Sequence, residues 1–342
     1  MENILMIKEW NLLRTVACLS VVLLHTTTQI GRSIGYPNID SYYFLRILLT
    51  YATPTFIVLS EVILANKYNN RIPEGFFTKR IKLIIFPFII FAVIDALVVN
   101  YISANGIDIT QKIISNLTGN FIGYFILIIF QFYILHYLII KFNISVLKLF
   151  PISIFVMYVH LWAIQQNFPF INEHATFFKL FFTAWGGYFT IAFLIGKEYQ
   201  TIAKFLYKYR WLTVVLLFYI VMFLFASYEG GNTRVDSRRL DIFPLSVGVS
   251  LFVLAWGQKL ANFNFINIIS NYSLGIYLLH WQVQRIITPY LTNKLIDISP
   301  HIQIIVLFTL SVVISMLIIK LISFLPFGKY IVGNTRRTYV KV

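Results

Sequence analysis

The first hydrophobic stretch of the chain reads NLLRTVACLSVVLLH (residues 11–25), and it carries two ionisable side chains in a segment otherwise suited to a lipid bilayer. Ionisable groups inside a membrane are costly and usually face a cavity or a partner, so Arg14 and His25 are both candidates for function. They are eleven residues apart, which on an α-helix places them on one face, about 16 Å apart along the axis. This segment therefore indicates a membrane helix with chemistry that crosses part of the bilayer.

The whole chain has the composition of an integral membrane protein. Of its 342 residues, 58% are hydrophobic and 12% are charged, and the mean hydropathy is +0.77. A soluble domain has about 25% charged residues. The net charge of +15 indicates membrane topology rather than nucleic-acid binding, because no basic motif module or soluble domain carries it. The single Cys18 excludes an internal disulfide and a cysteine-rich metal site.

Hydropathy predicts an all-α bundle of about ten transmembrane helices in a single domain over residues 1–342, with no separate soluble domain. The predicted spans cover residues 11–31, 42–66, 83–101, 121–140, 149–164, 178–196, 211–227, 243–258, 267–290 and 302–326. With the N-terminus inside, most of the 28 lysines and arginines fall in the segments on the cytoplasmic side. An even number of spans then places both termini in the cytoplasm.

Three ionisable groups lie at a similar predicted depth on three different spans. Counted from the cytoplasmic span ends, His25, Asp95 and His280 are each roughly 18–21 Å from the inner surface. A histidine can remove a proton from a hydroxyl near neutral pH, and a carboxylate can orient the histidine ring. The three groups are therefore a candidate catalytic site. The alternative is that each of them makes a structural polar contact elsewhere.

A basic cluster precedes the third span, in the run RIPEGFFTKRIKLIIFPF (residues 71–88). Its members Lys79, Arg80 and Lys82 can bind phosphate groups through charge-assisted hydrogen bonds. The same cluster can also act as a topology anchor against lipid headgroups. Charge alone favours the anchor.

Other polar groups in the spans give weaker signals. Glu61 is expected either to pair with Arg14 or to take part in catalysis. Gln131 is expected to pack or to form an inter-helix hydrogen bond. Arg46 and Arg285 lie near outer span ends and are expected to snorkel to the interface. His160, His174 and His301 lack the spacing of metal ligands, so no metal site is predicted.

Four motifs follow one another in an order that is found in a known family. They are Arg14 and His25 separated by ten residues, FIVLS (residues 56–60), KRIKLIIFP (residues 79–87) and NYSLGIYLLH (residues 271–280). In these motifs the chain resembles the acyltransferase-3 family of integral membrane acyltransferases, especially its polysaccharide-modifying, intercellular adhesin C-like members. The resemblance covers roughly residues 10–285.

The chain departs from the family pattern at two places. Glu61 stands where many members have glycine after the serine of the second span. Lys79 and Lys82 stand where many members have a pair of arginines. Lysine keeps the positive charge but lacks the bidentate fork of arginine.

The resemblance implies a membrane-bound O-acyltransferase in a bacterial plasma membrane. Its donor would be a cytoplasmic acyl-coenzyme A, most simply acetyl-CoA, used as a co-substrate rather than as a tightly bound cofactor. Its acceptor would be a hydroxyl of a cell-envelope polysaccharide or of a lipid-linked glycan. Membrane lipids and glycan-synthesis proteins would be its other partners.

Roles for individual residues follow from the motifs and the predicted depths. The residues assigned to catalysis are His25, Arg14, His280 and Asp95. The residues assigned to the donor phosphates are Arg14, Lys79, Arg80 and Lys82. His25 would act as a general base or as a transient acyl carrier, and His280 or a nearby donor would stabilise the oxyanion.

Two functions of other classes stay open. A polysaccharide exporter or flippase would need a continuous path with several sugar contacts, but it would not need acyl-CoA. A non-enzymatic subunit or lipid-interacting scaffold would tolerate the replacement of His25 and His280.

Overall fold

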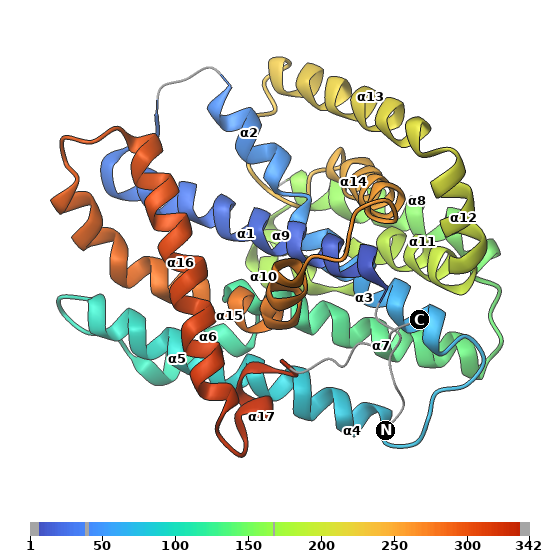
Figure 1. The fold of residues 1–342 in the computed structure, drawn as a ribbon, viewed down its shortest axis with the longest axis horizontal. Helices are drawn as coiled ribbons and strands as arrows, with labels where there is room; N and C mark the ends of the chain where they lie inside the picture. The colour runs from blue at the N-terminus through green and yellow to red at the C-terminus, as the bar shows by residue number, and fades with distance from the viewer. Residues whose placement is uncertain (1–6, 38–40, 167, 336–342) are drawn as a thin grey trace.

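The computed structural model describes residues 7–37, 41–166 and 168–335, and in these ranges every regular element is a helix (Figure 1). The longer helices are α1 (Lys8–Ile34), α3 (Ala52–Lys67), α5 (Phe86–Ile102), α7 (Phe125–Lys141), α8 (Val146–Gln165), α11 (Gly186–Lys197), α13 (Arg210–Glu229), α14 (Ile242–Gly257), α15 (Asn264–Lys294) and α16 (Pro300–Ser323). The shorter helices are α2 (Tyr42–Leu49), α4 (Phe76–Arg80), α6 (Ile109–Leu117), α9 (Pro169–Glu173), α10 (Ala175–Leu180), α12 (Tyr199–Lys208) and α17 (Gly328–Val332). The predicted all-α membrane fold is confirmed.

α1 is the central helix of the bundle. It packs along α15 and also contacts α3, α14 and α16, so it runs through the middle of the molecule (Figure 1). Small side chains such as Ala17 and Cys18, both fully buried, let the neighbouring helices approach closely. The polar side chains of α1 therefore meet other helices instead of lipid, which explains how this helix accommodates Arg14 and His25.

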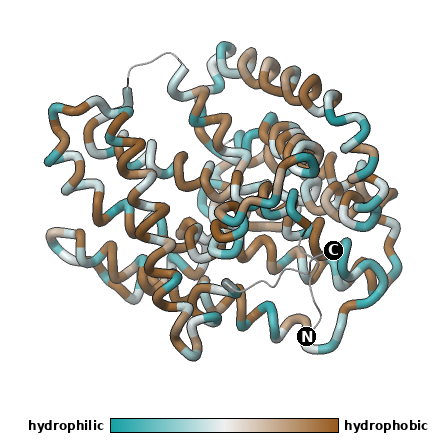
Figure 2. The backbone as a smooth tube through the Cα atoms, viewed as in Figure 1, coloured by the Kyte–Doolittle hydropathy of each residue, from teal (hydrophilic) through white to brown (hydrophobic). Residues whose placement is uncertain are grey.

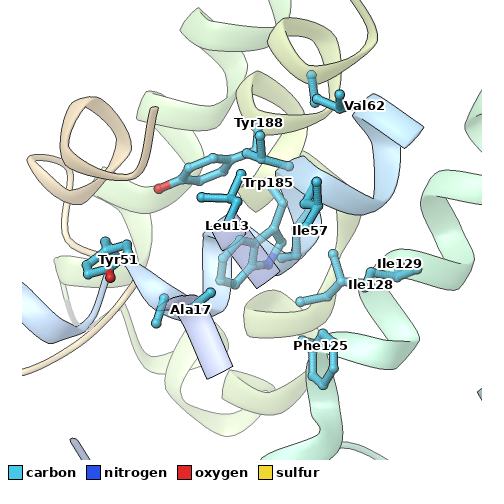
Figure 3. Packing of buried hydrophobic residues seen from close by; sticks show 14 of the residues in the cluster. Leu13, Ala17, Tyr51, Ile57, Val62, Phe125, Ile128, Ile129, Trp185 and Tyr188 are labelled. Atoms are coloured by element: carbon cyan, nitrogen blue, oxygen red, sulfur yellow. The ribbon is translucent and has the colours of Figure 1, made fainter. Parts of the chain in front are cut away.

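The apolar core joins α1 to α3, α7 and α11. Figure 3 shows Leu13 and Ala17 of α1 in the same buried apolar cluster as Ile57 of α3, Ile128 of α7 and Trp185, which directly precedes α11. Lipid tails are as apolar as these side chains, so close packing rather than water exclusion holds such helices together. This packing fixes the position of α1 within the bundle.

Helices at the edge of the bundle turn large apolar side chains outward. Along α13, Trp211, Phe218 and Phe223 are each about 60% exposed. Figure 2 shows the hydrophobic colour over most of α13. Soluble proteins rarely expose apolar patches of this extent, whereas a lipid-facing surface requires them.

Each predicted span coincides with helical structure, although three of them differ from simple membrane helices. In the described ranges, seven helical segments are long and apolar enough to cross a membrane. α11 and α14 are shorter than these segments, and α15 is long but more polar. The number of crossings and the cytoplasmic position of both termini stay predictions. Residues 1–6 and 336–342 lie outside the described ranges.

The predicted span over residues 178–196 begins too early. The chain is extended at Phe181, and α11 begins only at Gly186. Gln131 of α7 donates a hydrogen bond to the Leu180 carbonyl at 2.9 Å and accepts one from the Phe182 N–H at 3.1 Å. These bonds satisfy backbone groups that a continuous helix would otherwise pair. They also confirm that Gln131 hydrogen-bonds to a neighbouring element.

Candidate active site

The two predicted histidines meet between the two central helices. α1 and α15 pack along each other, and His25 Nδ1 lies 2.8 Å from His280 Nε2. The rings are nearly parallel, with 8° between their planes and 5.1 Å between their centroids. His280 is fully buried, and His25 is half-buried. The structure therefore joins two of the three groups that were predicted at one depth.

The backbone of α15 fixes which nitrogen of each ring carries a proton. The Ile276 carbonyl lies 2.9 Å from His280 Nδ1, and a carbonyl oxygen only accepts, so Nδ1–H donates to it. With one proton on each ring, His280 Nε2 then accepts from His25 Nδ1–H. The lone pair of His25 is left on Nε2, to which no described residue donates a hydrogen bond. His25 Nε2 is thus the basic nitrogen of the site.

His280 orients His25 in this arrangement. Both ring nitrogens of His280 are engaged, one with His25 and the other with the Ile276 carbonyl. The predicted role of His280 as an oxyanion donor does not fit this geometry, because neither nitrogen is left to donate to a substrate. The hydrogen bond from His25 Nδ1 instead holds the base in one orientation and stabilises the imidazolium formed when His25 takes a proton.

A cavity of about 470 Å³ lies beside the N-terminal part of α1, the end that the charge pattern assigns to the cytoplasm. We call it the inner cavity. The cationic side chains in its lining are Arg14, Lys67, Lys79 and Arg80. Its apolar part reaches Tyr277, whose ring centroid is 5.9 Å from that of His280. The inner cavity therefore extends from these cations to Tyr277, which contacts the histidine pair.

Neighbouring side chains hold two of these cations in place. Arg14 Nη1 donates a hydrogen bond to Ser270 Oγ of α15 at 2.9 Å. The Arg80 guanidinium lies over the ring of Tyr133, 5.1 Å from its centroid. The Tyr133 hydroxyl is 3.3 Å from Ser60 Oγ at the end of the FIVLS motif. Tyr133 thus connects that motif with the basic cluster.

Lys82 lies outside the inner cavity. α4 continues into α5 through a π-helical stretch, η1 (Ile81–Ile85), whose wider turn changes the angular register of the residues after Arg80. Lys82 is exposed, and among the described residues the cavity lining includes Lys79 and Arg80 but not Lys82. This geometry gives no support to the predicted contact between Lys82 and a donor phosphate.

A second cavity of about 360 Å³ lies toward the C-terminal end of α1, and we call it the outer cavity. The polar and aromatic residues in its lining are Arg32, Asp95, Asn120, Phe121, Tyr124, Lys179, Trp281 and Arg285. The ring of Trp281 meets that of His25 edge-on, with 4.9 Å between the centroids. The histidine pair therefore lies between two cavities, with Tyr277 on the inner side and Trp281 on the outer side.

Asp95 belongs to the outer cavity and makes no hydrogen bond to either histidine in the described part of the chain. Its Oδ1 accepts a hydrogen bond from Arg285 Nη1 at 2.7 Å. Its Oδ2 accepts from Asn116 Nδ2 at 3.0 Å and lies 3.8 Å from Lys112 Nζ. The predicted use of Asp95 to orient a histidine ring does not fit this arrangement, because neighbouring cations and the amides of Asn116 and Gln282 occupy the carboxylate.

The two arginines near the outer span ends do not snorkel, and that prediction is wrong. Arg285 pairs with Asp95, as described above. Arg46 is buried and donates hydrogen bonds to the hydroxyls of Thr27 and Thr28 at 3.2 and 3.1 Å. Acceptors on neighbouring helices satisfy both guanidinium groups inside the bundle, so neither side chain has to reach the interface.

Of the described residues that line the outer cavity, only Asp95 is a predicted site residue; three of the others are the two cations without an anionic partner and the tryptophan that contacts His25. They are Arg32, Lys179 and Trp281. Trp281 directly follows the NYSLGIYLLH motif, and Arg285 lies four residues further, a spacing that places both on one helix face. That spacing was a usable signal. Arg32 and Lys179 gave none, because they come from separate segments that only the tertiary fold brings together.

Glu61 pairs with His136, and the predicted pair with Arg14 is not formed. Glu61 Oε1 lies 2.6 Å from His136 Nδ1, and both side chains are fully buried. The second oxygen, Oε2, has no hydrogen-bond partner among the described residues. His136 Nε2 donates to the carbonyl of Tyr68, the residue after α3, at 2.9 Å. The pair thus joins α3 and α7 to the segment that borders the inner cavity.

Breaking this buried pair is expected to destabilise the protein. Glu61→Ala should lower the free energy of unfolding by about 3–5 kcal/mol, because His136 loses its buried partner. Unfolding of the purified protein in detergent, followed by heat or denaturant, measures this change. Glu229→Ala, at an exposed acid that ends α13, is the matched control and should change stability by less than about 0.5 kcal/mol. An equally small change for Glu61→Ala would contradict a stabilising role of the pair.

Comparison with known proteins agrees with this geometry. A model of the acyltransferase domain of the acyltransferase-3 family matches residues 7–320. A Bacillus subtilis protein named as a membrane-bound acyltransferase, YfiQ, is 36% identical over 295 residues, which cover 80% of each chain. A Staphylococcus aureus protein named as a poly-β-1,6-N-acetyl-D-glucosamine export protein is 26% identical over 282 residues, covering 78% of this chain and 79% of the relative.

A relative in Staphylococcus epidermidis with the same export name is 24% identical over 282 residues, or 78% of each chain. No solved structure is detectably similar to this chain. The match to the family model covers both central helices, the histidine pair, the outer cavity lining and the inner cavity lining except Asn334. The chain therefore belongs to the acyltransferase-3 family and is an integral membrane acyltransferase.

Proposed function

We propose that this protein moves an acyl group, most simply acetyl, from cytoplasmic acyl-CoA to a hydroxyl of a cell-envelope glycan. The observation that carries the proposal is the position of the histidine pair between two cavities of different chemistry. One cavity offers a donor site and the other an acceptor site. The reacting groups would then meet at His25 inside the membrane.

The inner cavity suits an acyl-CoA donor. Arg14, Lys79 and Arg80 supply positive charge where the phosphates of coenzyme A would bind. The apolar part of the cavity, lined by residues such as Phe56 and Phe125, suits the pantetheine arm. Arg14 and His25 are about 16 Å apart along α1, which is comparable to the reach of that arm. The thioester would therefore lie near the histidine pair while the phosphates stay at the entrance.

The chemical step follows from the orientation of His25. Its Nε2 takes the proton of the acceptor hydroxyl while the hydroxyl oxygen attacks the thioester carbonyl. His280 accepts the hydrogen bond from His25 Nδ1 and stabilises the imidazolium during the attack. When the tetrahedral intermediate collapses, the carbon–sulfur bond breaks and the imidazolium returns its proton to the leaving thiolate. The products are an O-acylated glycan and free coenzyme A.

Transfer of label from acetyl-CoA tests this proposal. Membranes that contain the protein, supplied with labelled acetyl-CoA and envelope glycan, should place base-labile label in the glycan. Membranes without the protein are the control. Absence of label above that control, with glycan retained inside cells that lack the protein, would overturn the proposal in favour of glycan export. Export is the function named for the staphylococcal relatives.

Neutralising a cation of the inner cavity is expected to weaken donor binding more than it slows the chemical step. Arg80→Ala should raise the KM for acetyl-CoA about tenfold or more, because it removes a charge-assisted contact worth about 1.5–3 kcal/mol. The value of kcat should change much less. Steady-state kinetics with varied acetyl-CoA measure both constants.

Two further variants sharpen this comparison. Lys148→Ala removes an exposed positive charge outside the inner cavity lining and should leave both constants unchanged. Lys82→Ala should resemble Lys148→Ala, because Lys82 lies outside the cavity. If Lys82→Ala raises the KM for acetyl-CoA as much as Arg80→Ala does, Lys82 binds the donor as the sequence predicted.

A further inference from the structure

The outer cavity has more positive than negative charge. Three of its lining residues are cations, namely Arg32, Lys179 and Arg285, and one is an acid, Asp95. Asp95 is already matched by Arg285 at 2.7 Å, and Lys112 adds a second cation at 3.8 Å. The acid of this cavity therefore cannot also neutralise the two remaining cations.

Those two cations lack an anionic partner in the described ranges. The Arg32 guanidinium lies 5.7 Å from the ring centroid of Trp281, and Lys179 Nζ lies 4.1 Å from that of Tyr124. Neither of them forms an ion pair with a described carboxylate. The nearby Asp236 is occupied by Arg238 at 2.8 Å. Arg32 and Lys179 thus present uncompensated charge to the cavity.

The surroundings of Lys179 make this charge costly without a ligand. Burial, together with the nearby Arg238, lowers the pKa of Lys179 to about 8. Lys179 is therefore still mostly charged at pH 7 but loses its charge as the pH rises above about 8. The groups around it are Tyr124, Asp236 and Arg238. A bound anion would offset this cost and stabilise the charged form.

The position of these cations relates them to the acceptor. Trp281 contacts both the histidine pair and Arg32, with its ring 4.9 Å from that of His25 and close to Arg32 and Arg285, and it lines the same cavity as Lys179. An aromatic ring of this kind offers an apolar face for a sugar. A group held by Arg32 and Lys179 would therefore belong to the same glycan whose hydroxyl reaches His25.

We propose that the outer cavity selects an acceptor glycan that carries an oxyanion, either a phosphate or a uronate carboxylate, bound by Arg32 and Lys179. This inference rests on the proposed acyl transfer but concerns only the acceptor. Arginine and lysine recognise both kinds of oxyanion through charge-assisted hydrogen bonds. A neutral glycan gains nothing from these cations, and a cationic amino-sugar chain is repelled by them.

Direct binding tests this inference without requiring catalysis. The full chain in detergent is titrated with oligosaccharides of matched length that carry glycerol phosphate, glucuronate, only N-acetylglucosamine or free glucosamine. We expect one of the two anionic probes to bind at least tenfold more tightly than the neutral one, with an affinity that falls as salt rises. The anionic probe that binds more tightly identifies the oxyanion. Equal binding of the neutral and anionic probes would overturn the inference.

Variants assign the binding to the two cations. The double variant Arg32→Gln, Lys179→Gln should lose at least tenfold in affinity for the anionic probe and nothing for the neutral probe. Lys294→Gln, at an exposed lysine that ends α15, removes one charge outside the cavity and should bind like the wild type. Unchanged affinity in the double variant would overturn the assignment.

Two further readouts separate possible failures. Arg32→Gln alone, at an exposed position, guards against a folding defect in the double variant and should also weaken binding of the anionic probe. In the wild type, binding should weaken above about pH 8, and Lys179→Arg should remove that dependence. If the protein binds the anionic probe but transfers no acetyl group, the proposed function is overturned and the anion site stands. If it transfers acetyl groups only to a neutral acceptor, the anion site is overturned and the proposed function stands.

Discussion

Replacing His25 with alanine is expected to reduce acyl transfer by about 10²–10⁴-fold, the range that a positioned general base contributes. His25 Nε2 is the one ring nitrogen of the pair that has no hydrogen-bond partner among the described residues, so it alone can accept a proton from the acceptor. The loss should appear in kcat, because the inner cavity lining does not include His25. Transfer of label from acetyl-CoA to glycan, at matched protein levels, measures it.

The control for this variant is donor binding. His25→Ala should bind acetyl-CoA with nearly the wild-type affinity, since the cations of the inner cavity are untouched. The helix should also remain stable, because alanine favours helix formation. Wild-type rates in His25→Ala would contradict the catalytic assignment, even though membership in the family would stand.

The second large effect is expected at His280, which positions the base. His280→Leu removes the acceptor for His25 Nδ1–H and should lower kcat by about 10²–10⁴-fold, as for other residues that orient a catalytic histidine. His280→Gln places an amide oxygen where it can accept that hydrogen bond, and it should retain at least tenfold more activity than His280→Leu. The comparison of these two variants measures positioning, since both remove the imidazole.

Combination with the first variant gives a further check. If His25 and His280 act as one unit, His25→Ala together with His280→Leu should be little worse than His25→Ala alone. Multiplication of the two losses would mean that His280 acts independently, for example on the oxyanion. Equal activity of His280→Gln and His280→Leu would likewise contradict the positioning role.

The motifs predicted the centre of the site better than its periphery. Arg14 and His25 share a helix face because of local geometry, and His280 was supported both by its predicted depth and by a family motif. Asp95 was grouped with them on depth alone. Depth along a helix does not fix which direction a side chain faces, and Asp95 faces Arg285 and Asn116 instead. The prediction for Asp95 therefore failed because it used the depth of the residue but not the direction in which its side chain points around the helix axis.

The helix boundaries likewise were predicted where they depend on local sequence and missed where they depend on a distant contact. Hydropathy placed a helix at each of the ten predicted spans because burial in lipid demands apolar helices of sufficient length. The late start of α11 depends on Gln131, a residue about 50 positions away, whose side chain bonds the backbone near Phe181. The residues close to α11 in the sequence therefore cannot predict that contact.

The sequence by itself determined the membrane class, the helical fold, the family and the two ionisable groups of the first helix, because these depend on composition and on periodicity within single segments. Only the tertiary structure decided which nitrogen of His25 is basic and which cations surround the outer cavity. Those features depend on hydrogen bonds and charges contributed by residues up to 255 positions apart. The packing of α1 against α15 brings such residues together, and local sequence does not encode it.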